Sequence, residues 1–221
     1  MIFSDRTVEI LKNFAGINQS AVFDKGTMLR TIAPSKTIFA KAEVCEIDAD
    51  FAIYDLPRFL NIMSLMKQPK VLVKDKNIVI SSEGKKVTYA IASRDTIVCP
   101  PNKDIVISDP VISFHLNEKD LDSVLKAKAV LSLPEIVFVG EEGKIKVRAT
   151  NTSDPTSDFY DVEVGETGLD FFVIYKSENF RFLSSDYDVK IIKGLVTEFS
   201  SKDVTYWIAA QSSSVIGSQN G

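Results

Sequence analysis

The pentapeptide FAIYD at residues 51–55 returns as FVIYK at residues 172–176, and this near-repeat divides the chain into two similar halves. Each copy is followed within a few residues by an Arg-Phe-Leu sequence, PRFL at 57–60 and FRFL at 180–183. Self-similarity at a long offset is typical of a chain that repeats a whole structural unit. The two halves are therefore predicted to be copies of one domain.

Two further pairs of segments support the repeat. KKVTYAIA at 85–92 is echoed by KDVTYWIA at 202–209, and VEILKNF at 8–14 resembles DSVLKAK at 122–128. The pairs occur in the same order, and their offsets differ only by amounts that changes in loop length absorb. Chance could supply one such pair but hardly three in register. Each copy has roughly 100 residues, a common domain size.

The boundary between the copies is expected in SRDTIVCPPNKDIVISD, residues 93–109, because adjacent prolines resist a helix and favour an extended connector. We expect a first domain over 1–92, the connector over 93–109 and a second domain over 110–221. The Ser/Gly-rich end from residue 211 is expected to be a loose tail.

Each copy shows the same order of helical and strand patterns. Apolar residues at helical spacing predict helices, and alternation such as KIKVRAT at 144–150 predicts strands joined by Glu-Gly turns. The fold class is therefore α+β, with two helices per domain packed on a mainly antiparallel sheet. The helices are expected over residues 4–15, 56–70, 116–129 and 176–184.

No constellation of residues suggests catalysis. The single histidine, His115, lies in an apolar strand pattern, and no phosphate-binding loop or zinc-ligand spacing occurs. The acidic segments 46–50 and 154–161 could hold Mg²⁺, but neither has the spacing of a calcium-binding loop, and both are typical of solvated turns. We expect no enzyme activity, metal or cofactor. No membrane-spanning or secretory pattern is present, so a cytoplasmic protein is expected.

Charge is unevenly distributed. The chain has 26 basic and 30 acidic residues, a net charge of −4. The four expected helices hold ten of the basic and six of the acidic residues, so they carry +4 and the rest carries −8. These helices could be ordinary solvated surfaces, or they could attract duplex phosphates without reading sequence. Lys144, Lys146 and Arg148 form a competing basic strand face, interpreted as the outward side of a sheet.

Three segments of the chain resemble the sliding clamp of T4-type phages. They are ILKNFAGIN at 10–18, FAIYDLPRFLNIMSLM at 51–66 and PPNK at 100–103. The resemblance covers nearly the whole chain and is densest in its first half. It implies a DNA-clamp fold that forms a homotrimeric ring, with helices lining the central hole. Such a ring encircles duplex DNA, tethers the replicative DNA polymerase and is opened by an ATP-driven clamp loader. It also implies a role in late transcription, in the host cytoplasm.

The resemblance assigns two sets of site residues by position. The residues expected to face DNA are Arg6, Lys12, Arg58, Lys67, Lys119, Lys126, Lys128 and Arg181. The residues expected to form a groove for partner peptides are Ile97, Val98, Val106, Trp207, Ile208 and Ala209. Trp207 fits either the groove or the core, since VTYWIA also has the pattern of a strand.

Two other classes of protein remain open on the sequence. A structural or virion-associated β-rich protein would share the repeat and the missing active site, but not the basic helices. A metal-dependent enzyme would use the acidic segments, and binding of Mg²⁺ or Mn²⁺ there would distinguish it.

Overall fold

The computed structural model describes residues 1–103, 105–194 and 196–217, and the backbone alone of Glu46. The chain divides into two compact units, Met1–Asp104 and Ile105–Gly221. The division falls inside the segment expected to be the connector, where the described residues form only a short 3₁₀ turn, η1 (Arg94–Thr96). The finer limits of the two domains and of the connector remain predictions.

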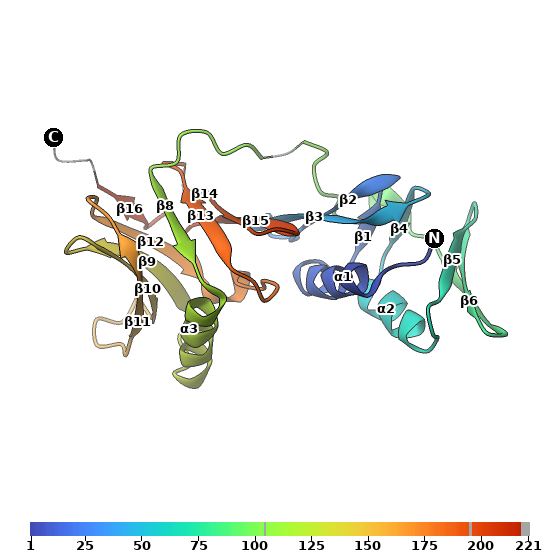
Figure 1. Cartoon of the computed structure of the whole chain (residues 1–221), viewed down its shortest axis with the longest axis horizontal. Coiled ribbons are helices and arrows are strands. Elements are labelled where there is room, and N and C mark those ends of the chain that lie inside the picture. The colour runs from blue at the N-terminus through green and yellow to red at the C-terminus, as the bar shows by residue number, and fades with distance from the viewer. Residues whose placement is uncertain (104, 195, 218–221) are drawn as a thin grey trace. The chain divides into compact units, whose positions relative to one another are not determined.

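Unit 1 consists of two helices and two antiparallel sheets (Figure 1). One sheet has the order β4-β1-β2-β3, and the other has the order β5-β6-β7. Helices α1 and α2 pack against each other, and α1 also contacts β2 and β3. The elements are α1 (Asp5–Ile17), β1 (Ala21–Phe23), β2 (Gly26–Ile32), β3 (Ile38–Ile47), β4 (Phe51–Ile53), α2 (Leu56–Ser64), β5 (Lys70–Val73), β6 (Asn77–Ser82) and β7 (Lys85–Ala90).

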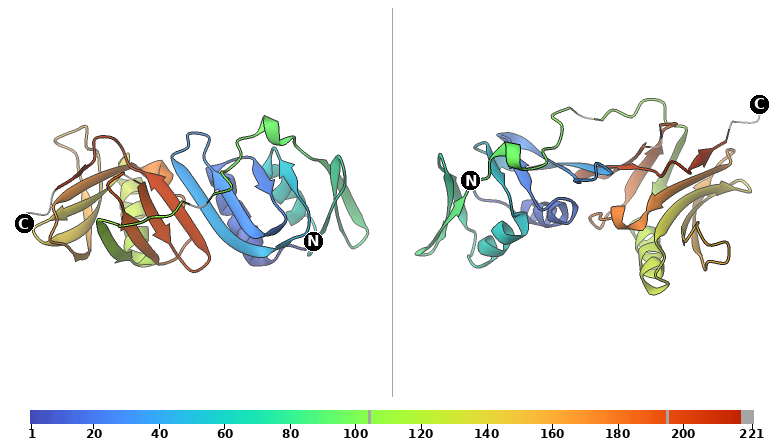
Figure 2. Two further views of the ribbon diagram at one scale, coloured as in Figure 1. Left: turned by 90° about the horizontal axis from the view of Figure 1, so that it is seen from above. Right: turned by 180° about the vertical axis from the view of Figure 1, so that it is seen from behind.

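The described residues of unit 2 form one α-helix and two antiparallel sheets (Figure 2). The strand orders are β15-β14-β13-β8 and β11-β10-β9-β12-β16, and α3 packs on β10 and β11. The elements are β8 (Ile112–Leu116), α3 (Glu118–Val130), β9 (Glu135–Glu141), β10 (Lys144–Thr150), β11 (Tyr160–Glu166), β12 (Phe171–Lys176), η2 (Ser177–Asn179), β13 (Tyr187–Ile191), β14 (Val196–Ser200), β15 (Val204–Ala209) and β16 (Val215–Ile216).

The α-helices begin where the sequence supplies a cap. Ser4 caps α1, because its side chain accepts a hydrogen bond from the backbone N–H of Thr7. Asp55 caps α2 in the same way through the N–H of Arg58, and Pro57 is tolerated in the first turn. The helices expected over 4–15 and 116–129 are confirmed by α1 and α3.

The other two expected helices need correction. Helix α2 ends at Ser64 and does not reach residue 70. A helix could not continue that far, because Gln68 has a positive φ and the following Pro69 disfavours a helical conformation at the residue before it. The helix expected over 176–184 is wrong: a single 3₁₀ turn, η2, stands there. Lys176 occupies the capping position that Asp55 has in the first copy, and it makes no side-chain capping hydrogen bond.

The strand predictions are confirmed where alternation is clean. β10 coincides with the expected strand, with Ile145, Val147 and Ala149 buried on one face. The Glu-Gly pairs at 83–84 and 142–143 form two-residue hairpin turns in which both residues have positive φ. The α+β fold class is thus confirmed, although the described residues of the second copy form one α-helix rather than the expected two.

The core of unit 2 is an aromatic cluster. The ring of Phe138 lies 5.1 Å from that of Tyr175 and 5.8 Å from that of Phe199, and Phe182 stacks on Tyr206 at 4.5 Å. Residues 180–183 reach this cluster from irregular chain. The corresponding segment of unit 1, PRFL at 57–60, instead lies in α2 and packs in the core of that unit. No helix among the described residues is long and apolar enough to cross a membrane.

Candidate nucleic-acid interface and partner groove

In unit 1, the residues expected to face DNA lie on or near the two helices. Arg6 and Lys12 are on α1, where Arg6 forms an ion pair with Glu9 at 2.6 Å and Lys12 is exposed. Arg58 is exposed in the first turn of α2, and Lys67 is exposed just beyond the end of that helix.

In unit 2, three of the expected residues lie on α3. Lys119 is exposed near its start, Lys126 pairs with Asp122 at 2.5 Å, and Lys128 is half-buried in the last turn. Arg181 lies beyond η2, and its Nε donates to the carbonyl of Glu178. These side chains therefore come from two units and from both helical and irregular segments.

The basic excess of the helices is smaller than expected. Within their observed bounds the three α-helices hold six basic and five acidic residues, a net charge of +1. The reduction arises because the expected helices extended over Lys67, Lys70, Lys176 and Arg181, which lie outside the α-helices. Among the described residues, five of the expected DNA-facing side chains make no ion pair. They are Lys12, Arg58, Lys67, Lys119 and Lys128.

The competing basic face on β10 is paired with carboxylates from its neighbouring strands. Lys144 contacts Glu163 at 2.9 Å, Lys146 contacts Glu141 at 2.9 Å, and Arg148 binds both oxygens of Asp161. The hydrogen bond from Lys146 and the nearby Arg148 guanidinium lower the pKa of Glu141, which keeps it ionised. This face therefore offers no unpaired positive charge to a polyanion.

The expected groove residues differ in accessibility. Val98 is 39% exposed and Val106 is 81% exposed, whereas Trp207 is 4% exposed and Ile208 is fully buried. The indole N–H of Trp207 donates to Glu198 on β14 at 3.0 Å. Ile97 is half-buried and Ala209 is exposed. Trp207 thus has the environment of a core residue, and the groove remains a prediction.

The structure reveals a hollow in unit 1 that sequence reasoning missed. It has a volume of about 460 Å³ and lies beside β7, with Tyr54, Arg58 and Tyr89 in its wall. The hydroxyl of Tyr89 donates to the Asp55 carbonyl, and burial raises the pKa of Tyr89. Tyr54 is 69% exposed. The sequence signal that could have indicated this hollow is Tyr54, a large aromatic residue directly after the buried strand β4.

The acidic segments have structural partners. Asp48 pairs with the N-terminal amine at 3.0 Å, and Asp50 accepts from the N–H of Lys25. The N–H and hydroxyl of Thr156 donate to Asp154 and lower its pKa. In the described part of the chain, no three metal-ligating side chains come together. His115 is exposed and contacts Asp188 at 2.9 Å.

Comparisons with known proteins agree on one family. The model of the family described as DNA polymerase processivity factor matches residues 4–99. The sliding clamp of Vibrio phage KVP40 is 30% identical over 96% of this chain and 99% of that protein, and the sliding clamp of Escherichia phage RB69 is 31% identical over 97% and 98%.

Solved structures show the same fold at low identity. The PCNA of A. fulgidus, solved with the C-terminal region of FEN-1, has a TM-score of 0.68 at 11% identity and covers 92% of this chain and 94% of its own. The Helicobacter pylori beta clamp has a TM-score of 0.67 at 14% identity; all of this chain matches 65% of that protein. The chain belongs to the family of sliding clamps of T4-type phages, the processivity factors of DNA polymerase.

Proposed function

We propose that this chain assembles as a homotrimeric ring that encircles duplex DNA and tethers the replicative DNA polymerase. The observation that carries the proposal is membership of the sliding-clamp family over nearly the full length of its relatives. The ring holds DNA by enclosing it, so it acts without catalysing a reaction. It works in the cytoplasm of the infected host.

Weak attraction to phosphates is what a sliding ring requires. A contact that neutralises a phosphate strengthens binding, but it also opposes movement along the duplex. Lys12, Lys67 and Lys119 are exposed and form no ion pair among the described residues, while the chain as a whole has a net charge of −4. A few unpaired cations on an acidic protein support sequence-independent sliding rather than tight binding.

Two sheet edges supply surfaces for joining copies head to tail. β7 is an outer strand of its sheet in unit 1 and carries Lys85 and Lys86. β11 is an outer strand in unit 2 and carries three carboxylates, which pair with Lys144 and Arg148 of β10. Phe159, next to β11, is 61% exposed and enters the hollow beside β7 of the next copy in this arrangement. An unlike contact of this kind closes into a ring when the rotation between copies allows it.

A ring that encircles DNA also needs a clamp loader to open it and a surface that binds the polymerase and the late-transcription machinery. An ATP-driven clamp loader opens and closes the ring, since the chain offers no phosphate-binding loop of its own. The polymerase and the late-transcription machinery bind through short peptides in the groove expected at residues 97, 98, 106 and 207–209. The exposure of Val98 and Val106 supports apolar contacts there.

The first experiment is native mass by light scattering over a concentration series, followed by retention on DNA. Three copies of the 24.5 kDa chain are expected at high concentration, with dissociation on dilution. After incubation with clamp loader and ATP, the protein is expected to stay on nicked circular DNA and to slide off linear DNA with free ends. A monomer at every concentration, or equal retention on both DNAs, contradicts the ring.

A further inference from the structure

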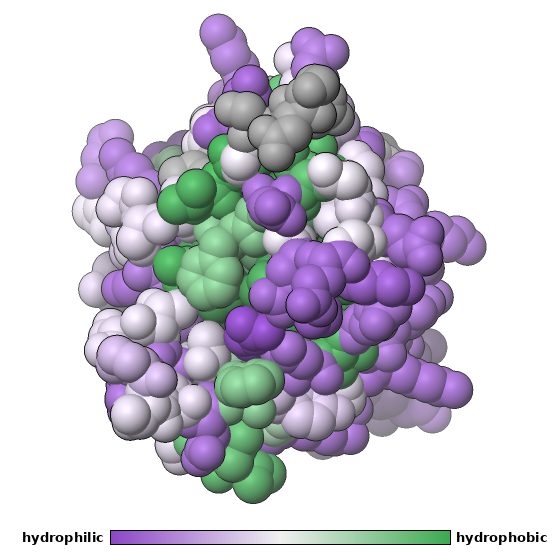
Figure 3. All heavy atoms as spheres, turned by 90° about the vertical axis from the view of Figure 1, so that its left-hand side faces the viewer, coloured by the Kyte–Doolittle hydropathy of each residue, from purple (hydrophilic) through white to green (hydrophobic). Residues whose placement is uncertain are grey.

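The face of the five-stranded sheet of unit 2 that α3 does not cover is divided into a charged half and an apolar half. One cross-strand row shows the division: Val215 lies opposite Phe172, Phe172 opposite Val139, and Val139 opposite Lys146. The apolar half thus spans β16, β12 and β9, and the ion-paired half spans β10 and β11. Figure 3 views the molecule from this side and shows apolar atoms exposed beside a band of hydrophilic ones.

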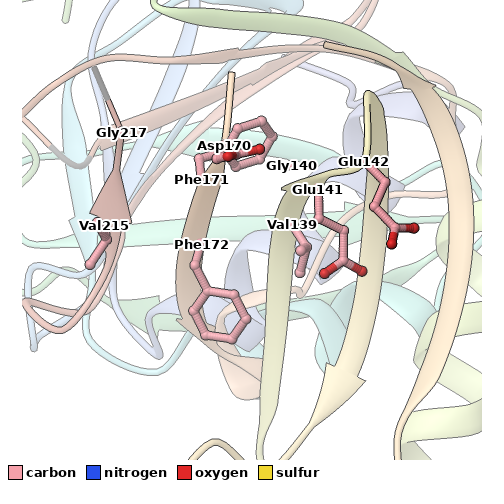
Figure 4. Close-up of a pocket in the computed structure, with 9 residues that line it drawn as sticks. All are labelled: Val139, Gly140, Glu141, Glu142, Asp170, Phe171, Phe172, Val215 and Gly217. Carbon is pink, nitrogen blue, oxygen red and sulfur yellow. The ribbon is translucent and has the colours of Figure 1, made fainter. Parts of the chain in front are cut away.

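The apolar half contains a hollow of about 470 Å³. Val137, Val139 and Ile174 form a buried cluster, and Phe172 packs on this cluster while remaining partly exposed. Figure 4 shows the Phe172 ring between Val215 on one side and Val139 with Glu141 on the other. Val215 is 62% exposed, although it belongs to a strand. The floor can therefore bury an apolar side chain supplied from outside.

The rim of this hollow is acidic. Glu141, Glu142 and Asp170 all line it, and no lysine or arginine does among the residues that the structure describes. Glu141 is paired with Lys146 and Arg148, but Glu142 and Asp170 make no ion pair among the described residues. An apolar floor with a rim on which Glu142 and Asp170 form no ion pair in the described part of the chain favours a ligand that presents an apolar residue next to basic ones, and it disfavours nucleic acid.

We propose that this hollow is a second docking site, which binds an extended peptide segment of a partner protein with an apolar side chain flanked by lysine or arginine. The apolar side chain covers Phe172 and Val215, and the basic side chains contact Glu142 and Asp170. The edge strand β16 suits an extended ligand, because its outer side has no neighbouring strand in the described sheet. The site shares no residue with the groove expected at residues 97, 98, 106 and 207–209.

The test is fluorescence anisotropy with the full chain and two dye-labelled peptides. One peptide carries a leucine with lysines two positions away on each side, which an extended backbone places on one face. The other carries glutamates instead of the lysines. The lysine peptide is expected to bind saturably and about fivefold or more tightly than the glutamate peptide.

Variants locate the binding. Glu142→Gln with Asp170→Asn is expected to remove most of the preference for lysine, and Val215→Ser to weaken both peptides. Asp75→Asn, an exposed carboxylate in the β5–β6 turn of unit 1, is the matched control and should bind as wild type. Absence of saturable binding, equal affinity for the two peptides, or unchanged binding by the hollow variants overturns the proposal. A change in native mass with no change in peptide binding assigns the surface to a second copy and also overturns it.

Discussion

Tyr175 illustrates how single residues stabilise unit 2. Its side chain is fully buried in the aromatic cluster, and its hydroxyl lies 2.5 Å from that of Thr197. Thr197 is also fully buried, so each hydroxyl depends on the other for a hydrogen bond. A buried hydroxyl without a partner costs more than an absent one, because it has lost its water.

Tyr175→Phe is therefore expected to lower the free energy of unfolding by about 2 kcal/mol, since it leaves the Thr197 hydroxyl unpaired. Tyr175→Phe with Thr197→Val removes both hydroxyls and should cost less than the two single changes combined. Urea unfolding of the four proteins measures this coupling. Strictly additive effects would show that the hydrogen bond contributes nothing.

The same residue predicts a loss of stability in alkali. Burial raises the pKa of Tyr175 above its ordinary value. Above about pH 10 the unfolded chain loses this proton while the folded chain keeps it, so the free energy of unfolding falls by about 1.4 kcal/mol per pH unit. Below that pH the contribution is fully present. Urea unfolding at pH 8 and at about pH 11 should show a steeper decline for wild type than for Tyr175→Phe. If the free energy of unfolding fell equally with pH in wild type and in Tyr175→Phe, Tyr175 would lose its proton in the folded protein as readily as in the unfolded chain.

Single residues also explain where the sequence misleads about helices. Both repeated segments form strands, β4 and β12, although Tyr54 is 69% exposed and its counterpart Tyr175 is fully buried. The repeat fails for the next element, because Asp55 caps a helix and its counterpart Lys176 makes no side-chain capping hydrogen bond. Similarity of apolar residues therefore preserves the strand, whereas the following helix depends on the residues that cap its first turn.

At the scale of elements, β10 shows what sequence periodicity can and cannot predict. Alternation correctly placed Ile145, Val147 and Ala149 on the buried face. It could not show that the opposite face is neutralised, because the carboxylates come from β9 and β11, and the register of β11 changes at Ile145 and Lys146. The charge of a strand face depends on long-range pairing, which local sequence does not contain.

The ion pairs on β10 should differ in their contribution to stability. Arg148 holds Asp161 through two hydrogen bonds of 2.7 Å and has a side chain only 20% exposed. Arg148→Ala is expected to lower the free energy of unfolding by about 1 to 2 kcal/mol. Lys144 is solvated, so Lys144→Ala should change stability little. Urea unfolding compares the variants, and equal effects would contradict the role given to burial.

The open edge of β7 predicts a defect in assembly. Lys85→Glu with Lys86→Glu would place negative charge against the carboxylates of β11 in the next copy, and like charges across paired strands are destabilising. The trimer should dissociate at a concentration about tenfold higher than wild type. Lys74→Glu with Lys76→Glu makes the same charge change in the β5–β6 turn and should leave assembly intact. Analytical ultracentrifugation measures both, and unchanged assembly of the β7 variant would assign the interface to another edge.

At the scale of the whole molecule, the balance of charge is the property that remains hardest to derive from sequence. The net charge of −4 follows directly from composition, but the positive surface does not. The expected helices carried an excess of +4 because one was too long and another, over 176–184, does not form; the observed bounds leave +1. What persists, among the described residues, is a set of cations without ion pairs on α1 and α3, in the first turn of α2 and just beyond that helix. The proposed inner surface therefore rests on the positions of these cations rather than on the total charge of the helices.

The corresponding prediction concerns retention on DNA. Replacement of Lys12, Lys67 and Lys119 by glutamate should weaken loading onto nicked circular DNA, because these exposed cations are expected to meet phosphates. The slope of binding against salt should fall by about one for each phosphate that the variant no longer neutralises. Replacement of Lys36, Lys74 and Lys76, all exposed in turns of unit 1, makes the same change of charge and should preserve loading. Thermal unfolding checks that both variants remain folded. If the two variants are retained equally and stimulate the polymerase equally, the surface that faces DNA lies elsewhere on the chain.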